Sequence, residues 1–207
     1  MVWLLRNYDL VLAAAWQHVV LTVISVSIAL LISLAVGIWA ARASAVYRVA
    51  LAITGIFYTI PSLALFAILI PLVGLGRVPA VIGLVGYSLL ALIRNIVTGI
   101  RGVPADVVEA ARGMGLTSRQ ILFRIELPLA LPVIVAGVRV VTVTVIGIGT
   151  VAAYINAGGL GSLIFSGIAQ TNGAKIASGA IVASAMAVGA DWGLQMLQRR
   201  LVAVAKM

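Results

Sequence analysis

The sequence predicts an all-α polytopic membrane protein with five or six transmembrane helices, and three observations support this. First, 63% of the 207 residues are hydrophobic and 9% are charged, whereas a soluble domain has roughly 25% charged residues. Second, the charges lie between long uncharged runs, and a helix needs about 20 apolar residues to cross the hydrocarbon core. Third, these runs are continuous rather than alternating, which favours helices as the spanning form.

Five uncharged or nearly uncharged runs are long enough to be spans. Residues 154–174 are Gly-rich and apolar, which is typical of a re-entrant or partial sixth segment. The segments outside the spans are short, so residues 1–207 are predicted to be a single transmembrane domain. The predicted spans lie near residues 19–41, 49–73, 79–100, 128–153 and 176–197.

Basic residues predict the orientation of these spans. With five spans, most of the flanking Arg residues fall on one side, among them Arg42, Arg94, Arg112 and Arg199. Cytoplasmic loops carry the excess of Lys and Arg, so the N-terminus is predicted to lie outside and the C-terminus in the cytoplasm. The net charge of +9 is therefore a topology signal and does not indicate nucleic-acid binding.

The longest segment between spans, 101–127, is predicted to be cytoplasmic and to contain two short helices. Asp106 can cap the first helix, and Glu109 three residues later completes a capping box. Gly115 then supplies a turn, and Thr117 opens the second helix. Taken singly, Glu109 and Gly115 need be no more than a capping residue and a turn residue.

The spacing of segment 101–127 as a whole resembles the EAA loop, the signature of ABC importer permeases. Four longer stretches resemble the osmoprotectant branch of that family: residues 58–76, 78–103, 126–139 and 155–168. The residues that fill the EAA pattern are Glu109, Ala110, Ala111, Gly115, Ile125, Leu127 and Pro128.

The resemblance implies a type I ABC importer transmembrane domain, multi-pass in the cell (inner) membrane. It also implies that segment 101–127 docks as a coupling helix on a separate cytoplasmic ABC ATPase. Further implied partners are a second copy or a homologous permease and an extracytoplasmic substrate-binding protein. Alternating access would move glycine betaine, choline, carnitine or proline betaine. The methionine importer permease is also similar, so a methionine or other amino-acid importer permease is the alternative.

The chain is not expected to be an enzyme. An ATP-binding P-loop needs a Gly-Lys pair, whereas Lys175 and Lys206 each follow an alanine. ATP and Mg are therefore expected on the partner ATPase, with no cofactor on this chain. No Cys and a single His, His18, also argue against a metal site and against an intramembrane enzyme.

Charged residues inside the spans are suspected of function. Arg139 lies near mid-membrane if its span starts at Pro128, or else reaches an interface if the helix starts deeper in the cytoplasmic boundary. Asp191 is expected to pair with an Arg for assembly rather than to relay protons.

The remaining candidates for the translocation path are polar or aromatic. Pro61 is expected to kink the second span, with Ser62 and Thr59 satisfying the freed backbone groups. Tyr rings attract quaternary ammonium groups but are also common interface anchors. Residues 158–161 supply glycines for irregular backbone beside a pore or for an external turn. The full set of path candidates is Tyr58, Pro61, Ser62, Tyr87, Arg139 and Asn156.

Residues 113–125 also resemble a DNA-binding helix-turn-helix. However, the second helix runs directly into a span at Pro128, which leaves little freedom to reach a duplex. A membrane-anchored DNA-binding or scaffold protein is therefore a remote alternative. The expected surroundings are the lipid bilayer, with no nucleic acid.

Overall fold

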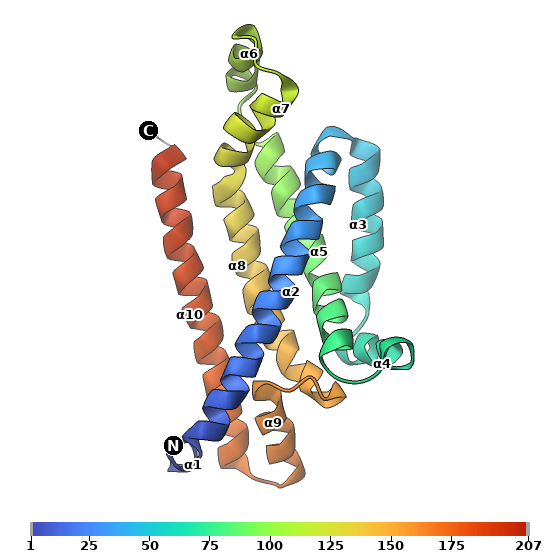
Figure 1. The fold of residues 1–207 in the computed structure, drawn as a ribbon, viewed down its shortest axis with the longest axis vertical. Coiled ribbons are helices and arrows are strands. Elements are labelled where there is room, and N and C mark those ends of the chain that lie inside the picture. The colour runs from blue at the N-terminus through green and yellow to red at the C-terminus, as the bar shows by residue number, and fades with distance from the viewer. Residues whose placement is uncertain (1, 206–207) are drawn as a thin grey trace.

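The computed structural model describes residues 2–205, and all regular structure in this range is helical (Figure 1). Four helices are long and apolar enough to cross a membrane: α2, α5, α8 with the short helices that adjoin it, and α10. The elements in order are α1 Val2–Arg6, α2 Tyr8–Arg42, α3 Ser44–Thr59, α4 Ser62–Val73, α5 Arg77–Arg101, α6 Ala105–Gly113, α7 Ser118–Ile121, the π-helix η1 Leu122–Glu126, α8 Leu127–Val151, the 3₁₀-helix η2 Ala152–Ile155, α9 Leu160–Ala169 and α10 Gly173–Ala205.

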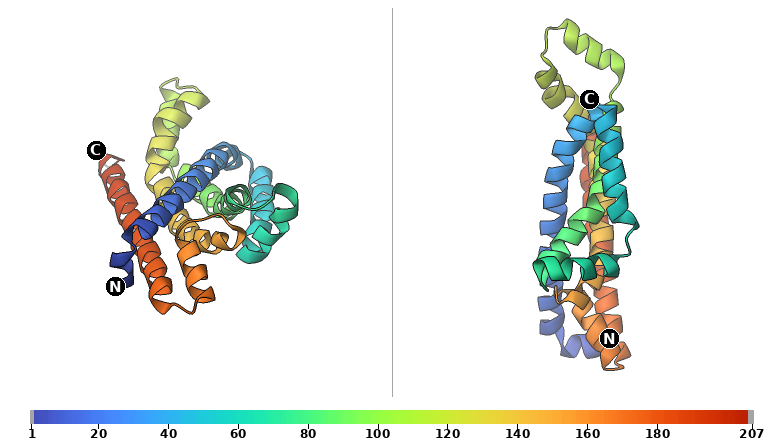
Figure 2. Two further views of the ribbon diagram at one scale, coloured as in Figure 1. Left: turned by 60° about the horizontal axis from the view of Figure 1, so that its bottom comes forward. Right: turned by 90° about the vertical axis from the view of Figure 1, so that its right-hand side faces the viewer.

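The segment predicted as one continuous span over 49–73 consists of two helices. α3 and α4 are bent by 99° relative to each other, and α4 lies across the direction of the long helices (Figures 1 and 2). Proline disfavours the α conformation in the residue before it, and Ile60, just before Pro61, has an extended ψ of 129°. The sequence predicted a kink at Pro61; the structure shows a complete break there.

α5 is the central helix of the bundle. In its most apolar stretch 61% of the residues are buried, against 17% in α10. It packs between α2, α3 and α8, and close approach to its neighbours requires residues without a Cβ. A Cβ added at Gly37 of α2 would lie 2.7 Å from Ile96, and one at Gly137 of α8 would lie 2.6 Å from Asn95. The main hydrophobic core therefore sits between α2, α5 and α8, with Leu84 and Leu92 fully buried in it.

Residues 154–174 do not form a sixth crossing. α9 has ten residues, about 15 Å of helix, whereas the hydrocarbon core is about 30 Å thick. The chain turns after α8, forms α9 beside the first part of α10 and continues into α10 (Figure 1). This segment is a short partial one, the second of the two forms expected for it.

The two ends of the bundle differ. α6 and α7 project beyond the long helices at one end, where the C-terminal part of α10 also lies (Figure 1). α1 and α9 lie at the opposite end. Every candidate site can be placed relative to these two ends.

Candidate functional site

The projecting element begins with α6. Its N-cap is Pro104, whose φ of −55° suits a helix start. The predicted capping box of Asp106 and Glu109 is absent: Asp106 accepts a hydrogen bond from the N–H of Val107 at 2.9 Å. This prediction was wrong because the helix starts at Ala105, so Asp106 lies inside the first turn and cannot cap it.

The turn after α6 is a Schellman motif centred on Gly115. The Gly115 N–H donates to the Arg112 carbonyl at 2.9 Å, and the Leu116 N–H donates to the Ala111 carbonyl at 3.1 Å. Gly115 has a φ of +82°, a conformation that a residue without a Cβ adopts at little cost. The predicted glycine turn is therefore present, and it sets the angle between α6 and α7.

α7 begins with a complete capping box. The Thr117 N–H donates to Gln120 Oε1 at 2.8 Å, and the Gln120 N–H donates to Thr117 Oγ1 at 3.3 Å. A four-residue helix needs such a cap because so few intrahelical hydrogen bonds hold it together. α6, the Gly115 turn and α7 thus form one folded knob at the end of the bundle.

The residues of the EAA pattern lie in two places on this knob and its base. Near the tip, Glu109 and Ala110 are exposed, whereas Ala111 is fully buried. At the base, Ile125 and Leu127 are half-buried and Pro128 is exposed. Met114 beside the turn has 73% of its surface exposed. The tip therefore offers an acidic residue beside apolar surface, which suits docking on another protein.

Three charged residues at the base of the knob make contacts that were not predicted from the sequence. Glu126 is only 3% exposed and pairs with Arg42, the last residue of α2. Arg101, the last residue of α5, donates to the carbonyl oxygens of Ala41 and Ala40 at 3.1 and 2.9 Å. Both contacts reach the turn between α2 and α3, so they tie the base of the knob to the bundle.

Four of the path candidates meet at the break between α3 and α4. The Tyr87 hydroxyl of α5 donates to the carbonyl oxygen of Ile60, and the Tyr87 and Tyr58 rings lie edge to face, with centroids 6.3 Å apart. The Ile60 carbonyl at the break is thus satisfied by Tyr87. The expectation that Ser62 satisfies this carbonyl was wrong, because the Tyr87 hydroxyl reaches it from the neighbouring helix α5. Thr59 donates instead to the Ile56 carbonyl within α3.

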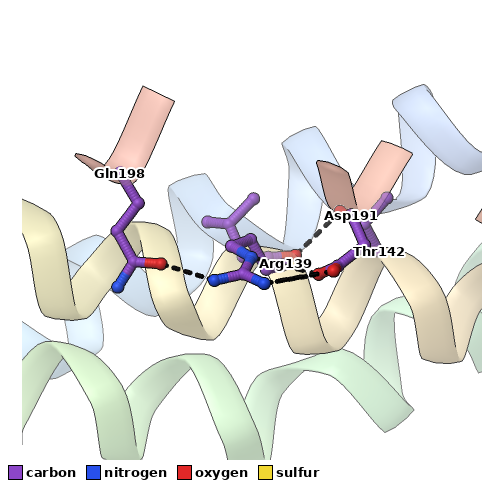
Figure 3. A network of polar contacts seen from close by, with 5 residues as sticks. Arg139, Thr142, Asp191 and Gln198 are labelled. Carbon is purple, nitrogen blue, oxygen red and sulfur yellow. Dashed lines mark hydrogen bonds and ion pairs between the residues drawn. The ribbon is translucent and has the colours of Figure 1, made fainter. Parts of the chain in front are cut away.

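Arg139 lies halfway along α8 and is paired across to α10 (Figure 3). Its Nε and Nη2 donate to the two carboxylate oxygens of Asp191 at 3.0 and 3.1 Å, and Nη1 donates to Gln198 Oε1 at 2.7 Å. The prediction that Asp191 pairs with an Arg is confirmed. Its guanidinium is therefore paired with side chains of α10 and does not present a free charge.

Asn156 follows η2, an element that packs against α4. It caps η2 in the left-handed conformation, with φ +65°, and is exposed. The neighbouring Ile155 carbonyl accepts a hydrogen bond from the Gly76 N–H at 2.8 Å. The described contacts therefore join Tyr87 to Tyr58 and to the break, join Arg139 to α10, and connect neither group to the side chain of Asn156.

A second polar cluster missed by sequence reasoning holds the glycine-rich turn before α9. His18 of α2 is fully buried, with its Nε2 3.0 Å from the Ile146 carbonyl oxygen, and its Nδ1 accepts from the Leu160 N–H at 3.3 Å. The adjacent Gln17 accepts from the Gly159 N–H at 3.1 Å. A lone buried His in a predicted span was the available signal. These bonds fix the turn as a packed structural element.

Replacing Gly159 with alanine is expected to lower stability by about 1–3 kcal/mol, because residues other than glycine are strained at its backbone conformation. Gly159 has a φ of +78°, and an added Cβ would lie 2.8 Å from His18 Nδ1. The check is the midpoint of thermal unfolding in detergent. The matched control is Gly189→Ala, where an added Cβ meets no heavy atom within 4 Å. Equal midpoints for the two variants would contradict the assigned role of this turn.

Comparisons with known proteins place the chain in a family. A family model described as "Binding-protein-dependent transport system inner membrane component" matches residues 33–203. The chain is 36% identical over 196 residues to the carnitine transport permease protein OpuCB of Listeria monocytogenes, covering 95% of this chain and 90% of that protein. It is 37% identical over 199 residues to the choline transport system permease protein OpuBB of Bacillus subtilis (strain 168), covering 96% and 92%.

Solved structures support the same fold. An inward-facing structure of the MetNI methionine ABC transporter matches with a TM-score of 0.84 at 23% identity, covering 93% of this chain and 96% of that one. An amino acid ABC transporter solved with histidines matches with a TM-score of 0.76 at 18% identity. The predicted type I ABC importer transmembrane fold is confirmed. The chain belongs to the binding-protein-dependent transport system inner membrane components and is a multi-pass membrane permease subunit.

Proposed function

We propose that this chain is the permease of an ATP-driven importer for a small osmoprotectant: glycine betaine, choline, carnitine or proline betaine. The observation that carries the substrate class is the 36–37% identity to a carnitine and a choline permease over almost the whole chain. The likeness to the methionine transporter is at 23% identity and supports the fold alone. A methionine or other amino-acid permease is therefore the less favoured function.

The knob of α6 and α7 supports coupling to a separate ATPase. It projects beyond the long helices at one end (Figure 1), and its exposed tip carries Glu109, Ala110 and Gly115. In this proposal ATP and Mg bind the partner ATPase, and this chain carries no cofactor. A second permease copy or a homologous permease completes the pathway, and a separate extracytoplasmic protein delivers the substrate.

The proposal sets the orientation of the chain. The end with the knob faces the cytoplasm, so the C-terminus is cytoplasmic and the N-terminus lies outside. The excess of basic residues near that end, among them Arg42, Arg101 and Arg112, supports this because cytoplasmic segments are enriched in Lys and Arg.

The path candidates take modest roles in this proposal. Tyr58 is 51% exposed beside the break at Pro61, so its ring can touch a passing quaternary ammonium group through a cation–π contact. Tyr87 and Ser62 shape the break from α5 and α4. Affinity is assigned mainly to the binding protein, because transport needs a path that binds substrate weakly.

Uptake in proteoliposomes tests the substrate class. The permease is reconstituted with candidate ATPases and binding proteins encoded near its gene, and radiolabelled choline, carnitine, glycine betaine, proline betaine and methionine are supplied separately. We expect ATP-dependent accumulation of at least one quaternary ammonium compound and none of methionine. Accumulation of methionine alone would replace this proposal with the amino-acid alternative.

A further inference from the structure

The two ends of the knob are tied to one corner of the bundle, the turn between α2 and α3. On the side entering the knob, Arg101 donates to the carbonyl oxygens of Ala41 and Ala40, and its guanidinium carbon lies 5.1 Å from the centroid of the Tyr47 ring of α3. On the side leaving the knob, Glu126 pairs with Arg42. A displacement of the knob is therefore passed to the same corner from both of its ends.

The Glu126 contact is unusual because of its burial. Among the Asp, Glu, Lys and Arg side chains that the structure describes, Glu126 is the one that is almost fully buried, at 3% exposed, whereas Arg42 is about half-exposed. A buried carboxylate is costly unless it is paired and hydrogen-bonded, and such pairs are weak evidence for stability. Their better-supported use is to specify one arrangement of the elements they join. Because Glu126 is buried, it cannot itself touch a partner protein.

The backbone around Glu126 departs from α-helix. Residues 122–126 form a π-helix between α7 and α8, and such single wide turns occur frequently at functional sites. Beside it lies a cavity of about 290 Å³ lined by Arg42, Glu126 and Arg112 of α6, together with Ser118 and Ile121. The base of the knob thus combines a π-helical turn with an adjacent cavity, and the charged pair joins this region to α2.

We propose that Arg42 and Glu126 are the positioning pair that passes movement of the knob to α2 and α3. The inference rests on the proposed function, in which the knob docks on an ATPase. α3 ends at the break at Pro61, so a corner that moves with the knob also moves the helix leading to that break. Hydrogen bonds between charged groups are about twice as strong as neutral ones. Without the pair, only the Arg101 contacts link the knob to α2 and α3, so α2 and α3 follow a movement of the knob less closely.

The first experiment separates assembly from coupling. Glu126→Gln and Arg42→Gln are each reconstituted as the whole transporter, with its ATPase and binding protein, in proteoliposomes. We expect the ATPase still to co-purify, since the exposed tip is unchanged. The substrate transported per ATP hydrolysed is expected to fall about tenfold, by analogy with the binding affinities of coupled sites, which change by about 5- to 150-fold. Arg48→Gln is the matched control, because Arg48 is an exposed basic residue of α3 near the same corner.

The second experiment replaces the ion pair with a covalent link. The chain contains no Cys, so Arg42→Cys with Glu126→Cys introduces its only two thiols. Both positions line the same cavity, where a small cleavable bifunctional thiol reagent can link them. We expect the double variant to be uncoupled, to regain transport after linking and to lose it again after cleavage. Each single Cys variant should show no such recovery. A residue needed only for folding would not respond to a reagent added after assembly.

The outcomes distinguish this inference from the function on which it rests. If wild-type permease holds no ATPase and transports none of the substrates, the proposed function fails. If the wild type transports and Glu126→Gln transports as efficiently as Arg48→Gln, only the positioning role is overturned. A double Cys variant that stays uncoupled when linked also overturns it.

Discussion

Replacing Gly115 with aspartate is expected to abolish ATP-driven transport while the permease still folds and inserts. Gly115 is exposed, and an added Cβ meets no heavy atom within 4 Å, so the new side chain does not clash within the chain. Its φ of +82° adds backbone strain of about 1–2 kcal/mol. The larger effect falls on the proposed ATPase contact, because an unpaired charge at an interface costs about 2 kcal/mol or more, a loss of at least about thirtyfold in binding.

The check is co-purification of the ATPase with tagged permease, followed by uptake in proteoliposomes. Gly115→Ala is the control for the backbone, since at φ +82° it adds at least as much strain as aspartate without a charge. We expect it to retain most of the binding that Gly115→Asp loses. Normal transport by Gly115→Asp would show that this turn does not meet the ATPase, and the coupling role assigned to Glu109, Ala110 and Ala111 would lose its support.

Removing the carboxylate of Asp191 is expected to lower stability by about 2–4 kcal/mol, because it leaves Arg139 charged and unpaired inside the membrane. Asp191 accepts two hydrogen bonds from Arg139, at 3.0 and 3.1 Å, across the contact of α8 and α10 (Figure 3). The remaining bond to Gln198 cannot neutralise the guanidinium. The measurement is the loss of monodisperse Asp191→Leu protein on heating in detergent, compared with Gln198→Leu, which removes a neutral partner of the same arginine.

The double variant Arg139→Met with Asp191→Leu decides what the pair does. If the pair serves helix packing, apolar side chains of similar size fill the contact, so stability and most of the transport should return together. A double variant that is stable but inactive would instead place Arg139 in the translocation path or in a proton relay. A double variant that regains neither stability nor transport would contradict the packing role.

Local features of the fold were predictable from the sequence. The long apolar runs predicted the membrane helices because hydropathy is a sum over neighbouring residues. The capping box of Thr117 and Gln120 is also a local feature, because both partners lie within one helical turn. The capping box of Asp106 and Glu109 failed because pattern alone does not settle the helix start, which moved to Ala105.

Contacts between distant segments were not predictable in the same way. Arg42 and Glu126 are 84 residues apart, and Arg139 and Asp191 are 52 apart. A single sequence shows that each charge needs a partner, and on this ground Asp191 was expected to bind an Arg. It does not show which Arg, because that depends on how α8 and α10 pack. The sequence placed Glu126 in the cytoplasmic segment 101–127, whereas the structure shows that it is buried.

The sequence by itself determined that this protein is helical, lies in the membrane and carries a helix–turn–helix knob with the EAA spacing. These properties follow from local hydropathy and from turn chemistry at residues such as Gly115. Only the tertiary structure decided that α3 and α4 are bent by 99° at Pro61 and that Tyr87 donates to the Ile60 carbonyl there. It also decided that Glu126 is buried against Arg42. The physical reason is that a buried polar group finds its partner through the packing of whole helices, and that packing is set jointly by surfaces far apart in the chain.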